Sequence, residues 1–188
     1  SGGEMSPKVK EAIEKVTKNG NYVFLCTGRN KRGVNDLIKY FDGMICSAGG
    51  YIEFENQEIY KEFMLEEEIE AVRDIFTRNH ILYNLEGTEI TFQSDGLDQL
   101  FIAGNIDEKN INSEMRRLMD EHNKCFNSHS LEEYQQNAAR IHKMCFVAKN
   151  PEDLEEPRRL LSHKYNFIIH EIFSKDVVNG EIIKKKKK

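Results

Sequence analysis

The order of apolar and polar positions predicts a helix and then a buried strand at the start of the chain. Apolar residues recur at Val9, Ile13 and Val16, behind the N-cap candidate Ser6, and this spacing marks one face of a helix. A continuous apolar run then covers residues 22–26. Because a short run without alternation is typical of a strand covered on both faces, we expect this strand inside a sheet.

A second helical pattern and a second strand follow closely. The helical pattern covers residues 34–40, and a short apolar strand covers residues 44–46. Strand, helix and strand within about 25 residues favour a right-handed crossover between parallel strands. Residues 47–50 then turn the chain, and residues 51–54 together with 58–60 predict a hairpin.

The composition shifts near Phe63, and the pattern beyond it predicts a second unit of mixed α+β structure. We therefore expect an α/β fold, a Rossmann-like parallel sheet with an inserted α+β domain. Residues 1–62 would form the first part of the sheet, residues 63–173 the inserted domain, and residues 174–188 would return to the first sheet. The elements expected after Phe63 are helices over 65–79, 107–122 and 150–161, strands over 81–83, 90–92, 143–148, 165–169 and 177–183, a turn at 86–87, an apolar segment at 100–102 and a polar loop over 127–136.

The charge distribution argues against a nucleic-acid-binding surface. The chain holds 27 basic and 32 acidic residues, a net charge of −5, but five of the lysines form the terminal run 184–188. The first 183 residues therefore carry a net charge of −10, which disfavours nucleic acid as a partner. No apolar stretch approaches the roughly 20 residues of a membrane-spanning helix, and no signal-peptide pattern opens the chain. We predict a cytoplasmic protein that binds neither nucleic acid nor membranes.

The cysteines and histidines show no metal-binding pattern. Cys26, Cys46, Cys125 and Cys145 form no C-x-x-C motif and lie near no pair of histidines at ligand spacing. Three of them lie in apolar runs, where cysteine behaves as a small buried hydrophobic residue. We therefore expect reduced core thiols rather than disulfides or metal ligands.

The end of the first predicted strand carries the clearest candidate chemistry. Thr27, Gly28 and Arg29 follow the strand directly, and ligands of open α/β sheets bind beyond the carboxyl ends of strands. Thr27 offers a hydroxyl and an N–H group, Gly28 permits close approach of the backbone, and Arg29 offers positive charge. These three residues are therefore candidate phosphate ligands, and the alternative is a strand-to-helix turn with an exposed arginine.

Several segments taken in order resemble the haloacid dehalogenase superfamily, specifically its Cof-type phosphatases with a large α/β cap. The core-like segments are residues 5–13, 22–29, 43–52 and 58–61. Residues 143–154 are similar to the late strand and helix of the cap in that family, and residues 180–183 are similar to the strand on which the chain returns to the core.

The resemblance implies a Mg²⁺-dependent phosphatase that acts on small phosphorylated, sugar-phosphate-like metabolites through an aspartyl-phosphate. It implies phosphate binding by Thr27, with Gly28 and Arg29 beside it, and substrate contacts in the loop Ser47, Ala48 and Gly49. In this loop, Ala48-Gly49-Gly50 replaces the Asn-Gly-Ala that is common in the family, so one amide group is missing.

The sequence lacks the other motifs of that family. It contains no D-x-D and no G-D-x-x-N-D, so we expect no catalytic aspartate and no metal ligand within this chain. The Mg²⁺ ligands and the nucleophile would then lie outside it, in a longer protein of which this chain is the middle, and the chain alone would be inactive. A phosphomutase of the same superfamily and a non-catalytic binding or regulatory module are the alternatives.

Overall fold

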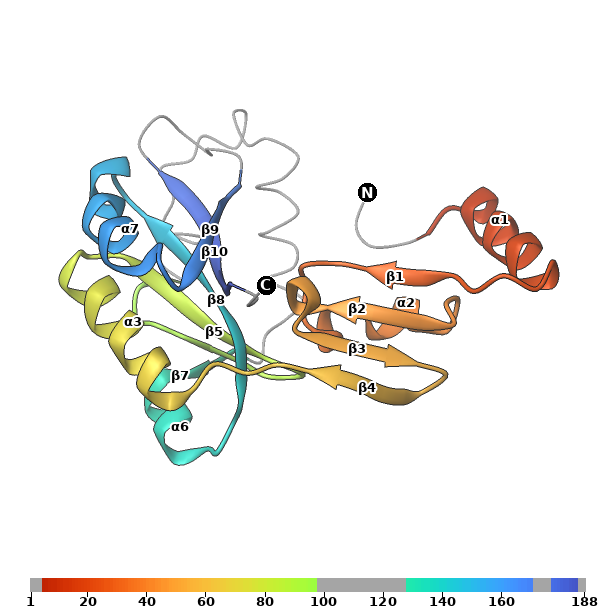
Figure 1. The fold of residues 1–188 in the computed structure, drawn as a ribbon, viewed down its shortest axis with the longest axis horizontal. Coiled ribbons are helices and arrows are strands. Elements are labelled where there is room, and N and C mark those ends of the chain that lie inside the picture. The colour runs from red at the N-terminus through yellow and green to blue at the C-terminus, as the bar shows by residue number, and fades with distance from the viewer. Residues whose placement is uncertain (1–4, 98–127, 171–176, 186–188) are drawn as a thin grey trace. The chain divides into compact units, whose positions relative to one another are not determined.

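The computed structural model describes residues 5–97, 128–170 and 177–185, which fall into two compact units. One unit comprises Ser1–Phe63 and the other Met64–Lys188. Each unit has its own β-sheet (Figure 1), and the fold is mixed α/β, as predicted. The predicted apolar segment at 100–102 and the predicted helix over 107–122 lie outside the described residues.

The first unit opens with helix α1, Pro7–Lys18, which begins where the sequence predicts. The N–H of Val9 donates to the hydroxyl oxygen of Ser6 at 3.4 Å, and Pro7 occupies the first helical position, where its missing N–H removes no helical bond. The predicted apolar face is present but open, since Val9 and Val16 are 47% and 42% exposed.

The first unit continues with a four-stranded sheet of order β1-β2-β3-β4. Strands β1 and β2 are parallel and the other pairs are antiparallel, so the predicted crossover and hairpin are both present. A 3-10 turn and a short helix connect β1 to β2, in place of the longer helix expected over 34–40. The elements are β1 Phe24–Cys26, η1 Lys31–Val34, α2 Asn35–Ile38, β2 Gly43–Cys46, β3 Tyr51–Phe54 and β4 Gln57–Lys61.

The expectation that the first strand is covered on both faces is wrong. Strand β1 lies at the edge of its sheet, and both Phe24 and Cys26 are exposed. Phe24 stacks instead on Phe54, with ring centroids 5.5 Å apart, on an open face of the sheet. The apolar run shows that these side chains are hydrophobic. It does not show whether other elements cover the strand, because those elements are distant in sequence.

The buried core of the first unit lies on the other face of this sheet, where Met44, Cys46 and Tyr51 pack against Val34. A Cβ atom on Gly43 would lie 2.4 Å from the ring of Phe24 and 2.6 Å from a backbone oxygen of β3. Position 43 therefore requires glycine for close approach of the strands.

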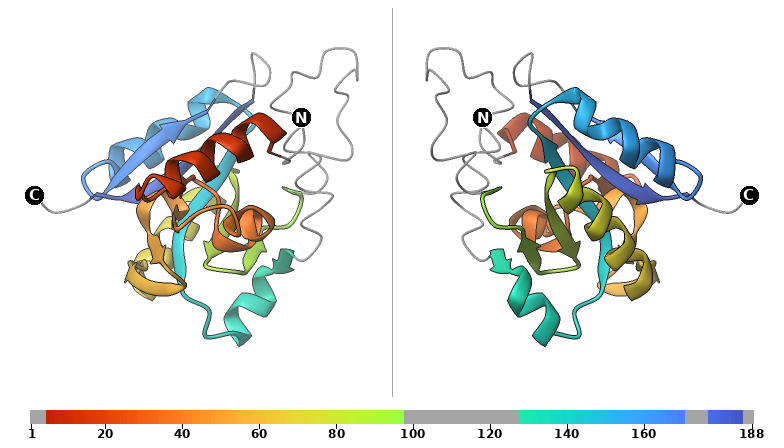
Figure 2. Two further views of the ribbon diagram at one scale, coloured as in Figure 1. Left: turned by 90° about the vertical axis from the view of Figure 1, so that its right-hand side faces the viewer. Right: turned by 90° about the vertical axis from the view of Figure 1, so that its left-hand side faces the viewer.

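The second unit is built on a six-stranded sheet of order β7-β6-β5-β8-β10-β9, in which only β6 and β7 pair in parallel. Helices α3 and α7 lie side by side on one face of the sheet (Figure 2). The elements are α3 Glu66–Arg78, β5 Leu82–Gly87, β6 Thr91–Gln93, β7 Ser128–Ser130, α6 Leu131–Gln136, β8 Ile141–Ala148, η4 Pro151–Leu154, α7 Glu155–Leu161, β9 Tyr165–Ile169 and β10 Val178–Lys184.

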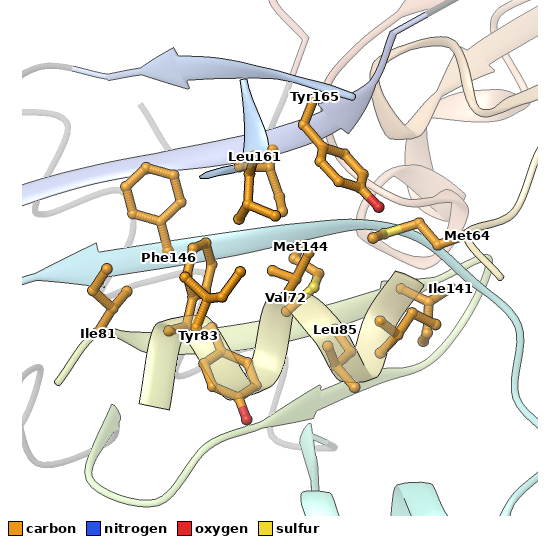
Figure 3. Close-up of a cluster of buried hydrophobic side chains, with 14 of the residues drawn as sticks. Met64, Val72, Ile81, Tyr83, Leu85, Ile141, Met144, Phe146, Leu161 and Tyr165 are labelled. Atoms are coloured by element: carbon orange, nitrogen blue, oxygen red, sulfur yellow. The ribbon is translucent and has the colours of Figure 1, made fainter. Parts of the chain in front are cut away.

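The core of the second unit fills the space between these helices and the sheet (Figure 3). Helix α3 contributes its buried residues Ile69, Val72, Ile75 and Phe76, which recur at helical spacing. Phe76 and Phe146 pack with their ring centroids 5.6 Å apart. No helix in the described part of the chain combines the length and the apolar character needed to cross a membrane.

Two predicted connections in the second unit are wrong. The predicted turn at 86–87 belongs to β5, which continues through Gly87 and stays paired with β8, although the register shifts between Glu86 and Gly87. The predicted polar loop over 127–136 contains helix α6, whose capping box joins Ser130 and Glu133 reciprocally. The pattern Ser-x-x-Glu at these positions is a helix-start signal within a segment whose polar composition favours a loop.

Residues 178–184 do not return to the first sheet, contrary to expectation. They form β10, which pairs with β8 on one side and β9 on the other. Asn179 and Gly180 do not interrupt the strand, because Gly180 lies opposite both Phe146 and Ile169. A Cβ atom at Gly180 would lie 2.4 Å from the backbone oxygen of Ile168, so glycine is required by close strand packing.

Candidate functional site

The two candidate loops of the first unit lie side by side beyond the carboxyl ends of β1 and β2. The N–H of Thr27 donates to the carbonyl of Ile45 at 2.9 Å, and the N–H of Ser47 donates to the carbonyl of Arg29 at 2.8 Å. These bonds extend the β1–β2 pairing past the end of the sheet. They bring the candidate phosphate ligands at 27–29 next to the candidate substrate loop at 47–49.

The loop after β1 leaves the Thr27 hydroxyl with a proton to donate. The N–H of Arg29 donates to Thr27 Oγ1 at 3.2 Å, which closes a small turn around the exposed Gly28. A hydroxyl that accepts one hydrogen bond can still donate its own proton. The next residue, Asn30, accepts from the N–H of Gly33 at 3.1 Å and caps η1, so the loop is held at both ends.

The loop after β2 has an unusual backbone. Ser47, Ala48 and Gly49 have consecutive positive φ angles of 51°, 53° and 90°. Only the glycine adopts this region without cost. Ser47 is 2% exposed, and its hydroxyl has no hydrogen-bond partner among the residues that the structure describes. The residue types at 47–49 predict a turn here, but nothing in the sequence indicates three consecutive left-handed residues.

Replacing Ala48 by glycine should raise the free energy of unfolding by about 0.5–1 kcal/mol. The left-handed conformation costs an alanine about 1–2 kcal/mol, and the greater freedom of glycine in the unfolded chain offsets part of that gain. Urea denaturation measures the change. Ala71→Gly, the same substitution at an exposed position inside α3, should instead destabilise by about 1 kcal/mol. If both substitutions destabilised the protein, the left-handed backbone at Ala48 would not be strained.

A buried carboxylate links the segments that follow the two loops. Glu53 Oε2 accepts from Lys31 Nζ at 2.7 Å and from the hydroxyl of Tyr51 at 2.6 Å. Burial would raise the pKa of Glu53, but the two hydrogen bonds outweigh it and lower the pKa. The hydrogen bond to Glu53 raises the pKa of Lys31, and burial, aided by Glu53, raises that of Tyr51 to about 12. At neutral pH the group is therefore an ion pair with a neutral phenol.

The second unit contains its own buried ionic cluster, for which the sequence gives no local signal. Lys143 is 3% exposed on β8 and forms ion pairs with Glu86, at 3.4 Å, and with Glu181. The thiol of Cys145 donates to the other oxygen of Glu86 at 3.0 Å. Burial lowers the pKa of Lys143, but the electrostatic influence of Cys145, Glu86 and Glu181 outweighs burial and raises it.

Cysteines in the described residues are free thiols with contrasting environments. Cys46 is buried, and burial raises the pKa of its thiol to about 11. Burial also raises the pKa of Cys145. Cys26 is exposed, which corrects the expectation that it belongs to the core, and the reason is the edge position of β1. Cys125 lies outside the described residues.

The described residues form no cluster of side chains that could hold a metal ion. Within residues 5–97, 128–170 and 177–185, no three His, Cys, Asp or Glu side chains converge as a metal ion requires. Mg²⁺ needs oxygen ligands in near-octahedral geometry, usually with one or two carboxylates. We therefore derive no chemical step through a metal ion from this chain.

Comparisons with known proteins relate this chain to a known family. A family model described as haloacid dehalogenase-like hydrolase matches residues 1–188. A comparison with curated proteins gave no match.

Solved structures share the fold at low sequence identity. A protein from Geobacillus kaustophilus is similar with a TM-score of 0.71 and 19% identity over 97% of this chain. A haloacid dehalogenase-like hydrolase from B. subtilis gives a TM-score of 0.70 and 12% identity over 96% of this chain. A sugar phosphatase of haloacid dehalogenase subclass IIB is similar with a TM-score of 0.61 and 16% identity over 95% of this chain. This chain spans 63%, 67% and 63% of the respective chains.

Proposed function

This chain belongs to the haloacid dehalogenase-like hydrolases, and on that basis we propose that its first unit binds the phosphoryl group of a small phosphate monoester. In this proposal the hydroxyl of Thr27 donates a hydrogen bond to a phosphoryl oxygen. Gly28 leaves room for the backbone to approach, and Arg29 supplies positive charge. Ser47, Ala48 and Gly49 contact the part of the substrate that carries the phosphate.

The observation that carries this proposal is the pair of hydrogen bonds between the ends of β1 and β2. Without the bond from the N–H of Ser47 to the carbonyl of Arg29, the two loops would be unrelated turns. With it, Thr27, the exposed Gly28 and the buried Ser47, whose hydroxyl has no partner among the described residues, lie at the same end of the sheet. Hydrogen-bond donors at such a position suit an anionic ligand.

The complete protein, in our proposal, is a Mg²⁺-dependent, cytoplasmic phosphatase that acts through an aspartyl-phosphate. Its nucleophilic aspartate and its metal ligands come from residues outside this chain, and this chain alone has no phosphatase activity. The first unit is then part of the catalytic core, and most of the second unit is the cap that sets specificity. The similarity of fold to a sugar phosphatase supports small, sugar-phosphate-like substrates.

Thr27→Val should weaken the binding of inorganic phosphate to the full 188-residue chain by about tenfold or more. Valine keeps the shape of threonine but removes one hydrogen bond to a charged group, which contributes about 1.5–3 kcal/mol. Titration with phosphate, followed by amide chemical shifts in two-dimensional NMR spectra, measures the dissociation constant. The matched control is Thr77→Val at an exposed position of α3, which should leave binding unchanged. Equal affinity for Thr27→Val and the unmodified chain would contradict the proposal.

A further inference from the structure

Glu53 connects the two candidate loops through a single carboxylate oxygen. Lys31 is the first residue of η1 and follows Asn30, which closes the loop after β1. Tyr51 is the first residue of β3 and follows the turn after β2. Because both side chains donate to Glu53 Oε2, at 2.7 Å and 2.6 Å, one atom holds the chain where it leaves each loop.

The ion pair between Lys31 and Glu53 lies where burial of charge costs free energy. Glu53 is 7% exposed, and its partner in the β2–β3 register is the fully buried Met44. Opposed residues of antiparallel strands lie on the same face, so the carboxylate is on the face that carries the apolar core. A buried ion pair there adds little net stability compared with two apolar side chains, although it does impose a specific geometry.

Lys31 adds a contact that reinforces this geometry. Its ammonium group lies 5.6 Å from the centre of the Tyr51 ring, within the range of a cation–π interaction. Lys31, Tyr51 and Glu53 are thus mutually bonded, while the N–H of Ser47 and the carbonyl of Arg29 tie the loops themselves. The loops cannot shift relative to each other without breaking one of these bonds.

We infer that Lys31, Tyr51 and Glu53 are positioning residues for phosphate binding at residues 27–29, an inference that rests on the proposed function. None of the three needs to touch the ligand. Their role is to hold the Thr27 hydroxyl and the Arg29 backbone at a fixed place relative to the Ser47 turn. A ligand-binding group that loses its supporting contacts becomes too loosely placed to bind well.

The test separates positioning from stability by removing both charges together. Lys31→Met alone leaves Glu53 buried and uncompensated, so it should lower the melting temperature as well as phosphate affinity. In the double variant Lys31→Met with Glu53→Met, the uncompensated charge is gone and thermal stability should recover. We expect its affinity for inorganic phosphate to stay about tenfold below that of the unmodified chain, the scale seen when residues that orient metal ligands are removed.

Two further variants sharpen the result. Lys31→Arg keeps the cation, and its guanidinium group can bond the same carboxylate. Its affinity for inorganic phosphate should therefore be close to that of the unmodified chain. The matched control replaces Lys61 and Glu58 by methionine, an exposed ion pair of the same unit with 2.5 Å between its charged atoms. This control should change neither affinity nor melting temperature appreciably.

Hydrogen exchange provides a readout that does not depend on ligand. The amide of Ser47, which donates to Arg29, should exchange faster in the double variant at equal global stability. Phosphate affinity and Ser47 exchange equal to those of the unmodified chain would overturn the inference, while the Thr27→Val result would leave the proposed function standing. If the unmodified chain itself binds no phosphate, the proposed function fails and the inference fails with it.

Discussion

Replacing Lys143 by methionine should lower the free energy of unfolding by about 3–5 kcal/mol, the usual cost of stranding a buried charge. Lys143 is 3% exposed and is the cation for both Glu86 and Glu181, of which Glu181 is 5% exposed. Methionine fits the space of the lysine stem but leaves two carboxylates without a counter-charge. Urea denaturation, with hydrogen exchange of the β8 amides to localise the effect, measures the loss.

The pH dependence of this loss identifies its cause. Despite burial, the negative groups around Lys143 raise its pKa, so its ion pairs stabilise the folded protein fully below the ordinary lysine pKa of about 10.4 and progressively less above it. The deficit should therefore be full at neutral pH and shrink as the pH rises past about 10.4. Lys149→Met, at an exposed position just beyond β8, should change stability by no more than about 0.5 kcal/mol. A deficit for Lys143→Met that is constant with pH would point to packing instead of charge.

Phe146→Ala should destabilise the second unit by about 3–5 kcal/mol, the range for removal of a buried phenylalanine. Phe146 is 2% exposed at the centre of β8, and its ring lies 5.6 Å from that of Phe76 on α3 and 6.0 Å from that of Phe167 on β9. It also packs against Gly180, which has no side chain to fill the gap. The cavity would therefore be bordered by a helix and two strands that cannot easily collapse (Figure 3).

Thermal and urea unfolding measure this loss, and hydrogen exchange assigns it to the second unit. Ile168→Ala, on β9 of the same sheet, is a suitable comparison because Ile168 is 36% exposed. It should cost about 1 kcal/mol or less, since partly exposed positions contribute less burial. A similar loss from both substitutions would mean that Phe146 does not occupy the centre of this core.

Elements set by local spacing could be predicted well from the sequence. Ser6 and the spacing of Val9, Ile13 and Val16 predicted α1, and the helix predicted over 65–79 is present as α3. Both signals involve contacts between residues three or four positions apart, so the local sequence contains them in full. The parallel pairing of β1 with β2 followed from the short crossover between them.

Elements set by distant neighbours could not be predicted in this way. Strand β10 was expected in the first sheet, but its pairing with β8 and β9 depends on register across the second unit. The burial of Lys143 could not be predicted, because a lysine within an apolar strand is ordinarily expected to be exposed. Its burial is explained by Glu181, which lies opposite Cys145 on the neighbouring strand. Long-range pairing decides both features.

The candidate site also combines features set by local sequence with features set by long-range pairing. The sequence alone identified the loop residues Thr27, Gly28 and Arg29 as candidate ligands for an anion, because their chemistry and their place after a strand are local properties. Only the tertiary structure brought Ser47 to Arg29 and linked Lys31 to Glu53, 22 positions apart. Local order along a chain specifies which groups are available, whereas the pairing of strands decides which of them meet.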